Sequence, residues 1–403
     1  MKYIVIFILS HLLFSCSLGD EVEEKDKVLE NNKPYTITKL TFHLDFLPRH
    51  TLSHVYESKS TKDKYIYFTD LITAKKISIF SLKGQKIKDL SLPPKIHQKY
   101  TIEDIHVENK NNIFLLLKSS NILINVDSTF AIRDSIRMPS VDELGRKIVL
   151  NSSIYSGIKV DENFVLECRP AIPSVRIKRN NDIVVEEYYD QIRKIPGFVS
   201  FELNDSQDSI MNEKYIFPEL RKSFGEAGDR IPEMPYHGLS GKKLLNSSIY
   251  SDSVHIYDFN TNLRTSIRVK SDCTSIGGAP RKLHENTLSN DARDVNDIYR
   301  YSGLINRVFY DSHRNLLYVM VFHEQKDENS KIYGAGRPWS LIVYNEDFEK
   351  VYEEAFEHDE YSMGFTKLTP RGLMILKQDK EQHEKNKRSE EKLYTFDIFD
   401  FDI

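Results

Sequence analysis

The sequence predicts an all-β fold, a six-bladed β-propeller whose last blade is closed by the N-terminal strand. Short alternating strand patterns recur along the 403-residue chain, and beyond the first residues no stretch keeps the 3.6-residue apolar period of an amphipathic helix. The strands fall into two recurring hairpin modules, and one strand stands alone near each end of the chain. These three observations carry the fold prediction.

The first module is a strand, a polar turn and a second, more apolar strand. The second strand is nearly continuous in apolar residues, as expected for a strand that is covered on both faces. The third copy is expected to begin at Ile158, with residues 151–156 in the connection before it. The six copies begin at Val55, Ile105, Ile158, Tyr236, Val308 and Gly364.

The second module is an alternating strand, a turn rich in Asp, Asn and Gly, and a half-polar strand. Complete copies begin at Lys76, Asn121, Phe198, Ser253 and Ser340. A sixth copy is cut short, because "KLYTFDIFDFDI" ends the chain, and "YTITKLTFHLDF" at 35–46 is its expected partner. Two hairpins make a four-stranded blade and six blades make a propeller. The borrowed strand leaves no unpaired edge inside the ring.

An open pair of β-sandwich sheets, or two separate β-domains, is the alternative fold. It is favoured by the irregular spacing of the strongest second strands, which begin near residues 113, 164, 244, 316 and 372. The ordered recurrence of both modules favours the propeller.

The N-terminus predicts export. Lys2 precedes an apolar run that ends at Phe14, which is shorter than the roughly 20 residues of a spanning helix and is typical of a secretory signal peptide. The "LFSC" at 13–16 resembles a bacterial lipobox, and this resemblance implies a lipoprotein signal peptide at 1–15 and a lipid on Cys16. Acyl chains on that residue would hold the protein on a membrane. An ordinary exported protein with an incidental cysteine is the alternative.

Residues 16–34 are expected to form a flexible tether, and residues 35–403 the propeller domain. The tether is polar and contains a cluster of acidic residues, so it has too little apolar surface to fold. The cluster resembles the surface-export signals of Bacteroidota lipoproteins, although a solvated spacer explains the same charges.

Composition limits the kinds of site and partner that we expect for this protein. Apart from Cys16, the chain has Cys168 and Cys273, which form either one disulfide or two free thiols. The formal net charge is −4, and no basic stripe interleaved with aromatic residues predicts a nucleic-acid partner. No nucleophile elbow, phosphate-binding loop or metal-ligand spacing is present, so we expect no cofactor and no metal.

The long connections predict a binding face. Segments 168–197, 217–237, 269–305 and 322–339 are all assigned to one rim of the propeller. Long loops in a compact domain are usually functional or disordered, and rigid scaffolds commonly carry their binding residues on such loops. The polar segment 377–392 is expected to be a solvated loop, or alternatively a charged docking arm.

Three arginines next to prolines lie in these connections: Arg169, Arg281 and Arg337. Proline fixes the local backbone, and a guanidinium presents a planar fork that suits a carboxylate or phosphate. With Trp339, these arginines are the predicted ligand contacts, as a cationic mouth for an anionic ligand. In the alternative interpretation, they satisfy nearby carbonyls and carboxylates.

Histidines are scattered near the same rim and have no helical ligand spacing. Only convergence around a central channel would assemble them into a metal site, and sequence spacing does not show it. They are His97, His237, His284, His323 and His358.

These features, together with late segments such as "GRPWSLIVYNEDFEKVYEEAF" at 336–356, resemble a Bacteroidota lipoprotein family of unknown function with a six-bladed, TolB-like propeller. The resemblance implies the fold and a place in the cell envelope, on the outer membrane, but no catalytic residue. The leading hypothesis is a lipid-anchored protein that binds or scaffolds a protein, peptide or glycan through its long loops. The competing hypothesis is a hydrolase or lyase that acts at the channel mouth on an extracellular polymer or lactone.

Overall fold

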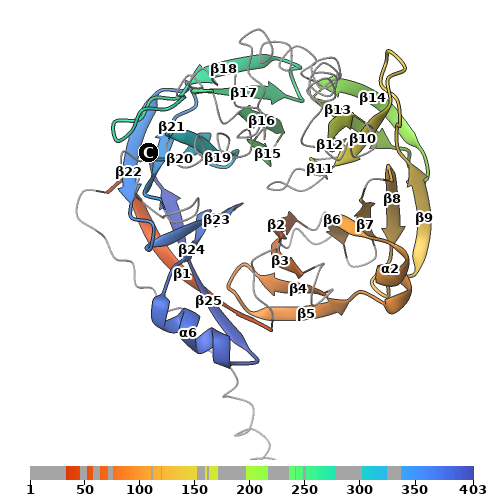
Figure 1. The fold of residues 1–403 in the computed structure, drawn as a ribbon, viewed down its shortest axis with the longest axis horizontal. Helices are drawn as coiled ribbons and strands as arrows, with labels where there is room; N and C mark the ends of the chain where they lie inside the picture. The colour runs from red at the N-terminus through yellow and green to blue at the C-terminus, as the bar shows by residue number, and fades with distance from the viewer. Residues whose placement is uncertain are drawn as a thin grey trace, which may run out of the picture.

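The computed structural model confirms the predicted propeller, in which six small antiparallel sheets surround a central axis (Figure 1). The structure describes residues 33–45, 52–57, 64–70, 76–109, 112–118, 120–151, 159–160, 163–170, 197–216, 236–240, 242–247, 251–277, 302–324 and 337–403. The predicted signal peptide and residues 16–32 of the predicted tether lie outside the described residues.

Blades one to five follow the chain from the innermost to the outermost strand. Blade one is β2 (Leu52–Glu57), β3 (Lys64–Asp70), β4 (Lys76–Ser81) and β5 (Lys86–Ser91), and blade two is β6 (Ile102–Asn109), β7 (Asn112–Leu117), β8 (Ile122–Val126) and β9 (Ile132–Arg137). Blade three is β10 (Ile148–Asn151) and β11 (Lys159–Val160), followed by β12 (Asn163–Pro170), β13 (Phe198–Leu203) and β14 (Ile210–Ile216). Blade four is β15 (Tyr236–Ser240), β16 (Lys243–Ser247), β17 (Ser253–Asp258) and β18 (Arg264–Arg268), and blade five is β19 (Leu304–Asp311), β20 (Leu316–Phe322), β21 (Trp339–Tyr344) and β22 (Lys350–Phe356).

Blade six is built from both ends of the chain. It consists of β23 (Tyr361–Thr369), β24 (Gly372–Lys377), β25 (Lys392–Phe401) and, as its outermost strand, β1 (Tyr35–Leu44). The pairing of β1 with β25 is antiparallel and runs without a bulge from Tyr35 opposite Phe401 to Leu44 opposite Lys392. This register confirms the predicted closure of the ring by the N-terminal strand.

The burial of each strand follows its place in the blade. Every residue of β7, β20 and β21 is buried, whereas the outer strands β5, β9 and β18 are mostly exposed. The middle strands are covered by a neighbouring blade on each face, which is why their sequences are continuous apolar runs. Outer strands face solvent and keep charged residues.

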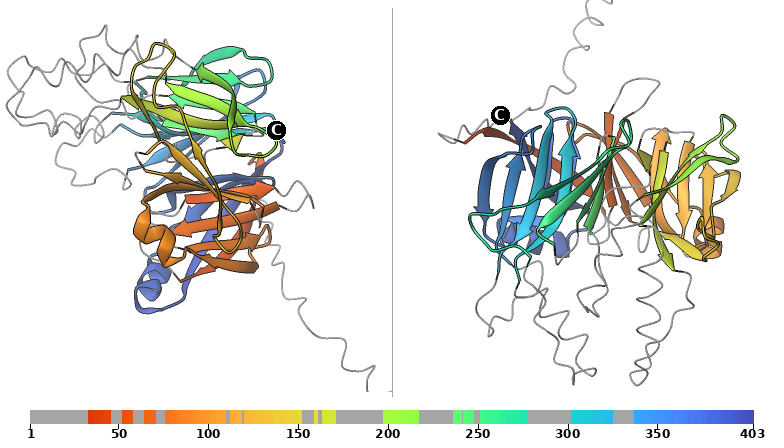
Figure 2. Two further views of the ribbon diagram at one scale, coloured as in Figure 1. Left: turned by 90° about the vertical axis from the view of Figure 1, so that its right-hand side faces the viewer. Right: turned by 90° about the horizontal axis from the view of Figure 1, so that it is seen from above.

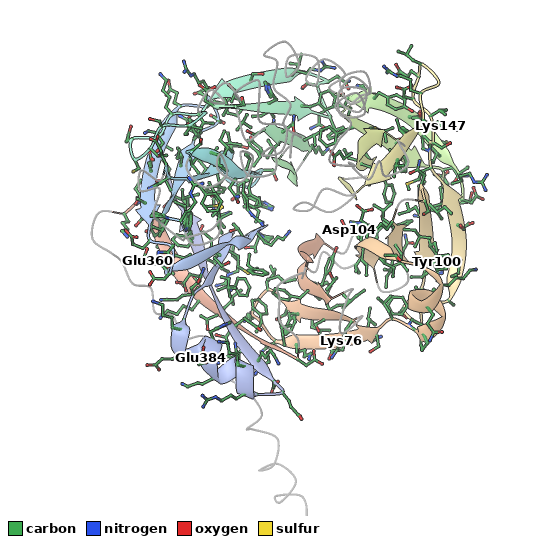
Figure 3. The ribbon with its side chains drawn as sticks, in the orientation of Figure 1. Lys76, Tyr100, Asp104, Lys147, Glu360 and Glu384 are labelled. Atoms are coloured by element: carbon green, nitrogen blue, oxygen red, sulfur yellow. The ribbon has the colours of Figure 1, made fainter. Side chains whose placement is uncertain are left out.

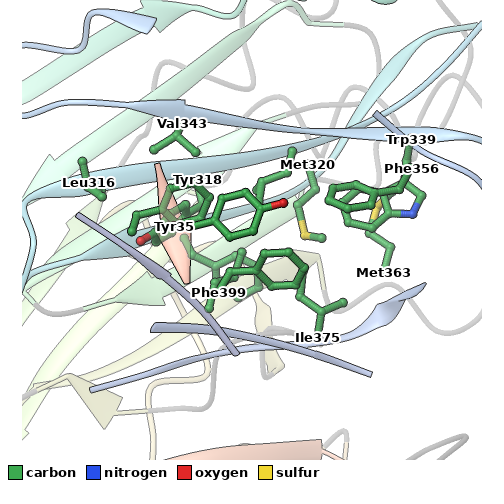
Figure 4. Close-up of a cluster of buried hydrophobic side chains, with 14 of the residues drawn as sticks. Tyr35, Leu316, Tyr318, Met320, Trp339, Val343, Phe356, Met363, Ile375 and Phe399 are labelled. Atoms are coloured by element: carbon green, nitrogen blue, oxygen red, sulfur yellow. The ribbon is translucent and has the colours of Figure 1, made fainter. Parts of the chain in front are cut away.

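The hydrophobic core is divided among the contacts between blades. The described residues form six buried clusters, and each lies between two neighbouring blades. The cluster between blades five and six is the largest; it includes Trp339 stacked on Phe356, with Tyr35 from the N-terminal strand beside Phe399 (Figure 4). The cluster between blades three and four includes Val165, Phe198 and Ile216 of blade three and Leu244 and Tyr257 of blade four.

A shared turn explains why the second module recurs. In four blades, a polar residue begins the turn, accepts backbone N–H groups with its side-chain oxygen, and is followed three residues later by a residue with positive φ. Short polar side chains stabilise such turns by bonding to their own backbone. The residue pairs are Ser81 and Gly84, Asp127 and Phe130, Asn204 and Gln207, and Asn345 and Phe348.

The start of blade three differs from the prediction. The innermost strand is expected at Ile158, but β10 already pairs with the far end of β12, and the two-residue β11 pairs with its near end. Asn151 therefore ends a strand instead of lying in a connection. The long strand β12 offers two places for an inner partner, and the sequence pattern revealed only the second.

The prediction of a loop at 377–392 is wrong, because the segment contains a helix, α6 (Lys380–Arg388). Asp379 caps it by accepting the N–H of Gln382 at 2.9 Å, and the buried Asn386 donates to the carbonyl of Leu393 and accepts its N–H. A cap and an attachment to β25 stabilise this helix without an apolar face. A second short helix, α2 (Pro94–Lys99), links blades one and two.

Cys168 is buried and Cys273 is exposed, and both are free thiols. The structure thus favours two thiols over the disulfide alternative, since Cys168 lies on β12 of blade three and Cys273 in the connection after β18 of blade four. Within the described residues, no helix combines the length and apolar character needed to cross a membrane.

The closure predicts a large stability effect at Phe42. Its fully buried ring contacts Phe68 and Phe80 of blade one and Phe396 of blade six. Phe42→Ala should lower the free energy of unfolding by about 3–5 kcal/mol, because a cavity opens where the ring closes. Denaturant unfolding measures the change, and Thr41→Ala, at the exposed neighbouring position, is the matched control. Equal stability of the two variants would contradict the assigned closure.

Candidate functional site

Antiparallel pairing sorts the connections into two rims, as predicted. The turns inside the hairpins leave from the short-turn rim, and the links between hairpins and between blades leave from the long-connection rim. Segments 171–197, 217–235, 269–303 and 323–338 join strand ends of the long-connection rim. Helices α2 (orange) and α6 (blue) lie on this side of the disc (Figure 2).

The described chain enters the propeller at the opposite rim. Tyr35 begins β1 and pairs with Phe401, which ends β25 on the short-turn rim. The N–H of Asp402 also donates to the carbonyl of Pro34 at 3.1 Å. In Figure 2 the C-terminus accordingly lies on the side away from α2 and α6. Both ends of the described chain therefore meet at the short-turn rim.

Arg337 lies inside the protein, where no ligand reaches its guanidinium. Its side chain is fully buried, donates through Nη2 to the carbonyls of Ser302, at 2.6 Å, and His323, and lies over the ring of Phe322. Direct ligand contact by Arg337 does not fit this burial. The geometry is that of the alternative interpretation, an arginine that satisfies nearby carbonyls.

Trp339 is buried as well. It is 1% exposed and stacks on Phe356 with ring centroids 4.5 Å apart, so it is a core residue of blades five and six. His323, beside it on this rim, shares a 2.7 Å hydrogen bond with Ser340, and burial lowers the pKa of its imidazole. His323 and Trp339 lie at the two ends of segment 323–338, where it joins β20 and β21.

The structure describes the remaining predicted ligand contacts and histidines only in part. Arg169 belongs to β12, near its end on the long-connection rim, and its side chain is outside the description. Arg281 and His284 lie outside the described residues, and the side chains of His97 on α2 and His237 on β15 are not described. His358 is partly exposed. Among the residues that the structure describes, no three His, Cys, Asp or Glu side chains gather to hold a metal ion.

A different group of charged residues meets at the propeller axis. Asp104 on β6, Arg307 on β19 and Lys367 on β23 all belong to innermost strands, those of blades two, five and six. Figure 3 shows Asp104 on the inner side of the ring. Asp104 and Arg307 are buried, at 0% and 6% exposure, and Lys367 is largely buried with part of its surface exposed.

Irregular backbone precedes each of the three. Glu103 is an extra residue in β6, Asn306 is one in β19, and residues 363–365 are inserted into β23. Bulges re-aim the side chains that follow them and are common beside active sites. Three of the innermost strands are therefore interrupted in their halves nearer the long-connection rim, just before a charged residue.

The charges of Arg307 and Asp104 act on Lys367. Burial lowers the pKa of the Lys367 ammonium, the Arg307 guanidinium lowers it further, and the Asp104 carboxylate opposes them, which together place it at about 7 instead of 10.5. A lysine is therefore half-charged near neutral pH at the axis. Strongly shifted groups concentrate at functional sites, although ion networks in structural positions shift pKa values too.

Sequence reasoning missed this group. The residues occur in "IEDIHVEN", "LINRVFYD" and "YSMGFTKLT", where charged residues interrupt the first strand of a module. This interruption is the one signal that was available. It does not show which blades face each other across the axis, so it does not bring the residues together.

The sequence matches no family model and no curated protein. Among solved structures, a DUF4221 family member from Bacteroides vulgatus is similar, with a TM-score of 0.62 and 15% identity over 90% of this chain and 96% of that chain. At this identity the likeness shows the fold alone. It agrees with the fold that the predicted resemblance implied, whereas lipoprotein status and family membership stay predictions.

Two further structures are more distant. A Bacteroides fragilis protein assigned as exported has a TM-score of 0.48 at 11% identity, over 91% of this chain and 96% of that chain. Virginiamycin B lyase from Staphylococcus aureus has a TM-score of 0.39 at 8% identity, over 90% of this chain and 99% of that chain. Neither similarity is strong enough to bear on function.

The lowered pKa of Lys367 predicts how the free energy of unfolding depends on pH. Between pH 7 and 10.5 the unfolded chain keeps a proton on this lysine that the folded protein has lost, so the free energy of unfolding rises with pH across that window. Its share is at most about 1.4 kcal/mol per pH unit. Lys367→Met should remove this rise, as measured by denaturant unfolding from pH 6.5 to 9.5.

Lys380→Met is the matched control, because that lysine on α6 has an 82% exposed side chain. It should leave the slope of stability against pH as in the parent protein. The same slope in the parent and in Lys367→Met would show that the lysine titrates normally.

Proposed function

We propose that the protein is a lipid-anchored, extracytoplasmic propeller, held on the outer membrane by Cys16, that binds or scaffolds a protein, peptide or glycan through its long-connection rim. The sequence supports export and lipidation through the lipobox-like "LFSC" at 13–16. The observation that carries the proposal is the separation of the two rims. The strand that follows the tether begins on the short-turn rim, whereas the long connections leave from the other.

This separation gives the rims different surroundings. A lipid anchor at Cys16 is connected through the tether to Tyr35, where β1 begins. The short-turn rim is therefore the rim that is attached to the bilayer and faces it. The segment from Cys16 to Tyr35 reaches at most about 68 Å when fully extended, at roughly 3.3–3.6 Å per residue. The long-connection rim then faces away from the lipid and is open to a large partner.

A hydrolase or lyase that acts at the axis on an extracellular polymer or lactone is the second candidate. The pKa of Lys367, at about 7, favours it, because an amine with such a pKa acts as a general base near neutral pH. Turnover that is lost in Lys367→Met would favour this candidate over binding alone.

A fluorescence-quenching experiment tests which rim of the propeller faces the membrane. A fluorescent donor is attached at Lys83→Cys, in an exposed turn of the short-turn rim, or at Lys380→Cys on α6, in a Cys273→Ser background. In vesicles with acceptor lipids, the donor at position 83 should be quenched more strongly. Cys16→Ser should release the protein from the membrane fraction. Equal or reversed quenching would refute the orientation, and membrane retention of Cys16→Ser would refute the anchor.

The same two positions test the binding face. The intact lipoprotein is used to capture partners from solubilised envelopes, and a bulky polyethylene glycol is then attached at position 83 or 380. Shielding position 380 should abolish capture of any reproducible partner, while shielding position 83 should leave it unchanged. Loss of capture from the short-turn rim alone would assign the binding to the other face.

A further inference from the structure

A basic patch lies on the outer strands of blades one and six, beside the short-turn rim. The turn at 82–85, between β4 and β5, lies against β1, because a Cβ added to Gly84 would be 2.9 Å from the carbonyl oxygen of Thr41. Arg371, in the turn between β23 and β24, donates through Nη1 to the carbonyl of Leu82 at 3.2 Å. These contacts bring the outer parts of the two blades together (Figure 1).

This patch and the whole chain have net charges of opposite sign. Residues 35–45, 76–91 and 370–371 contain six Lys and Arg against two Asp, a net charge of +4, whereas the formal net charge of the chain is −4. The two acids, Asp45 and Asp89, both pair with Lys76, at 2.5 and 2.8 Å, and Asp89 also pairs with Lys86 at 2.9 Å. Positive charge therefore remains in excess at the surface. The exposed lysines of the patch are Lys39, Lys83, Lys86 and Lys88.

An apolar side chain is exposed among these lysines. Ile87 is 51% exposed and lies between Lys86 and Lys88 on β5. It is the extra residue of a bulge, because Ile79 pairs with Lys88 and Phe80 pairs with Lys86. Lysines and a bulge protect an outer strand from pairing with another chain, but an exposed isoleucine does not serve that purpose. The patch therefore offers an apolar contact as well as positive charge.

Other turns of the short-turn rim are acidic. The turn of blade three contains Asp205 and Asp208, and the turn between β21 and β22 of blade five contains Glu346, Asp347 and Glu349. An anionic surface would therefore attract the rim at blades one and six and repel it at blades three and five. Such a surface is expected to bind the disc in a tilted orientation.

We propose that the basic patch docks on anionic lipid headgroups, with its exposed lysines at the phosphates and Ile87 at the boundary of the acyl chains. The assignment rests on the proposed membrane attachment, because the short-turn rim is the one connected to the tether. Each lysine near an anionic bilayer strengthens binding about fivefold, the ratio that corresponds to roughly 1 kcal/mol. Four lysines bind weakly, so the patch orients a protein that the lipid on Cys16 retains.

The acidic segment 20–26 of the tether is the competing occupant of the patch. It carries five acidic residues and one lysine, so its charge also complements the patch. Lipid is favoured because a bilayer offers an apolar layer next to its charged groups, which suits an exposed isoleucine between lysines. The acidic segment offers charge and a single apolar residue, Val22.

Vesicle sedimentation tests the patch without the anchor. The chain from residue 16 onward, with Cys16→Ser, is mixed with phosphatidylcholine vesicles or with vesicles in which one-third of the lipid is phosphatidylglycerol. It should bind only the anionic vesicles at 0.1 M salt, where the Debye length is about 10 Å, and should be released at 1 M salt, where that length is about 3 Å. This chain has no lipid, so its failure to bind would leave the anchor standing, and loss of the anchor would appear only in the lipidated protein.

Variants of exposed residues separate charge from apolar contact. Lys83→Gln, Lys86→Gln and Lys88→Gln combined should weaken binding to the anionic vesicles about a hundredfold, from about fivefold for each lysine. Ile87→Ser keeps every charge and should weaken binding severalfold, because apolar surface no longer leaves water. Thermal unfolding of each variant reports whether it is folded.

The matched control changes three exposed lysines of α6 on the long-connection rim. Lys380→Gln, Lys385→Gln and Lys387→Gln combined alter the net charge by the same amount as the patch variant. This control should bind the anionic vesicles as tightly as the parent chain, because its lysines lie on the opposite rim.

Several results would overturn the proposal. One is equal binding to neutral and anionic vesicles, and another is equal binding by the patch variant and the α6 control. Unchanged binding by Ile87→Ser would remove the isoleucine from the bilayer contact. If anionic vesicles are bound only after Glu21, Glu23 and Glu24 are replaced by Gln, the acidic segment of the tether covers the patch. If they are not bound even then, the lysines only protect an outer strand.

Discussion

The pairing of β1 with β25 is the contact on which the rest of this structure depends. Each hydrophobic cluster lies between two blades, so an open ring would expose apolar surface of blades six and one. Closure covers it and leaves no free strand edge within the ring. Lys33 and Tyr35 fasten the start of β1 to blade five through Glu354, by an ion pair of 2.6 Å and a hydrogen bond. The pairing of the first and last strands therefore keeps the ring of blades closed.

Closure of the ring also determines which segments of the chain lie on each rim. Because the outermost strand of blade six comes from the N-terminus, the chain enters on the rim of short turns and leaves the rim of long connections free. The same ring brings the innermost strands around one axis, and bulges in β6, β19 and β23 precede charged residues there. The long connections thus lie on one rim, and the charged residues Asp104, Arg307 and Lys367 lie on innermost strands around the axis.

Much of the fold was predictable because its signals are local. The continuous apolar run of β20 indicates a strand covered on both faces, and the Asp127 and Asn345 turns mark the second hairpin. Unpaired strands at the two ends indicate closure. The helix α6 was missed because it has no apolar face, and β10 because its partner β12 is shared with β11.

The sequence by itself determined the strands, their hairpins and the six-fold recurrence, since each depends on residues that are neighbours along the chain. Only the tertiary structure determined which charged side chains are buried and which groups they contact. Arg337 looked like a surface contact but is buried against two carbonyls, while Arg307 and Lys367, far apart in sequence, act on each other across two blades. The physical reason is that desolvation and Coulomb interactions depend on distance and burial in space, which are set when the ring closes.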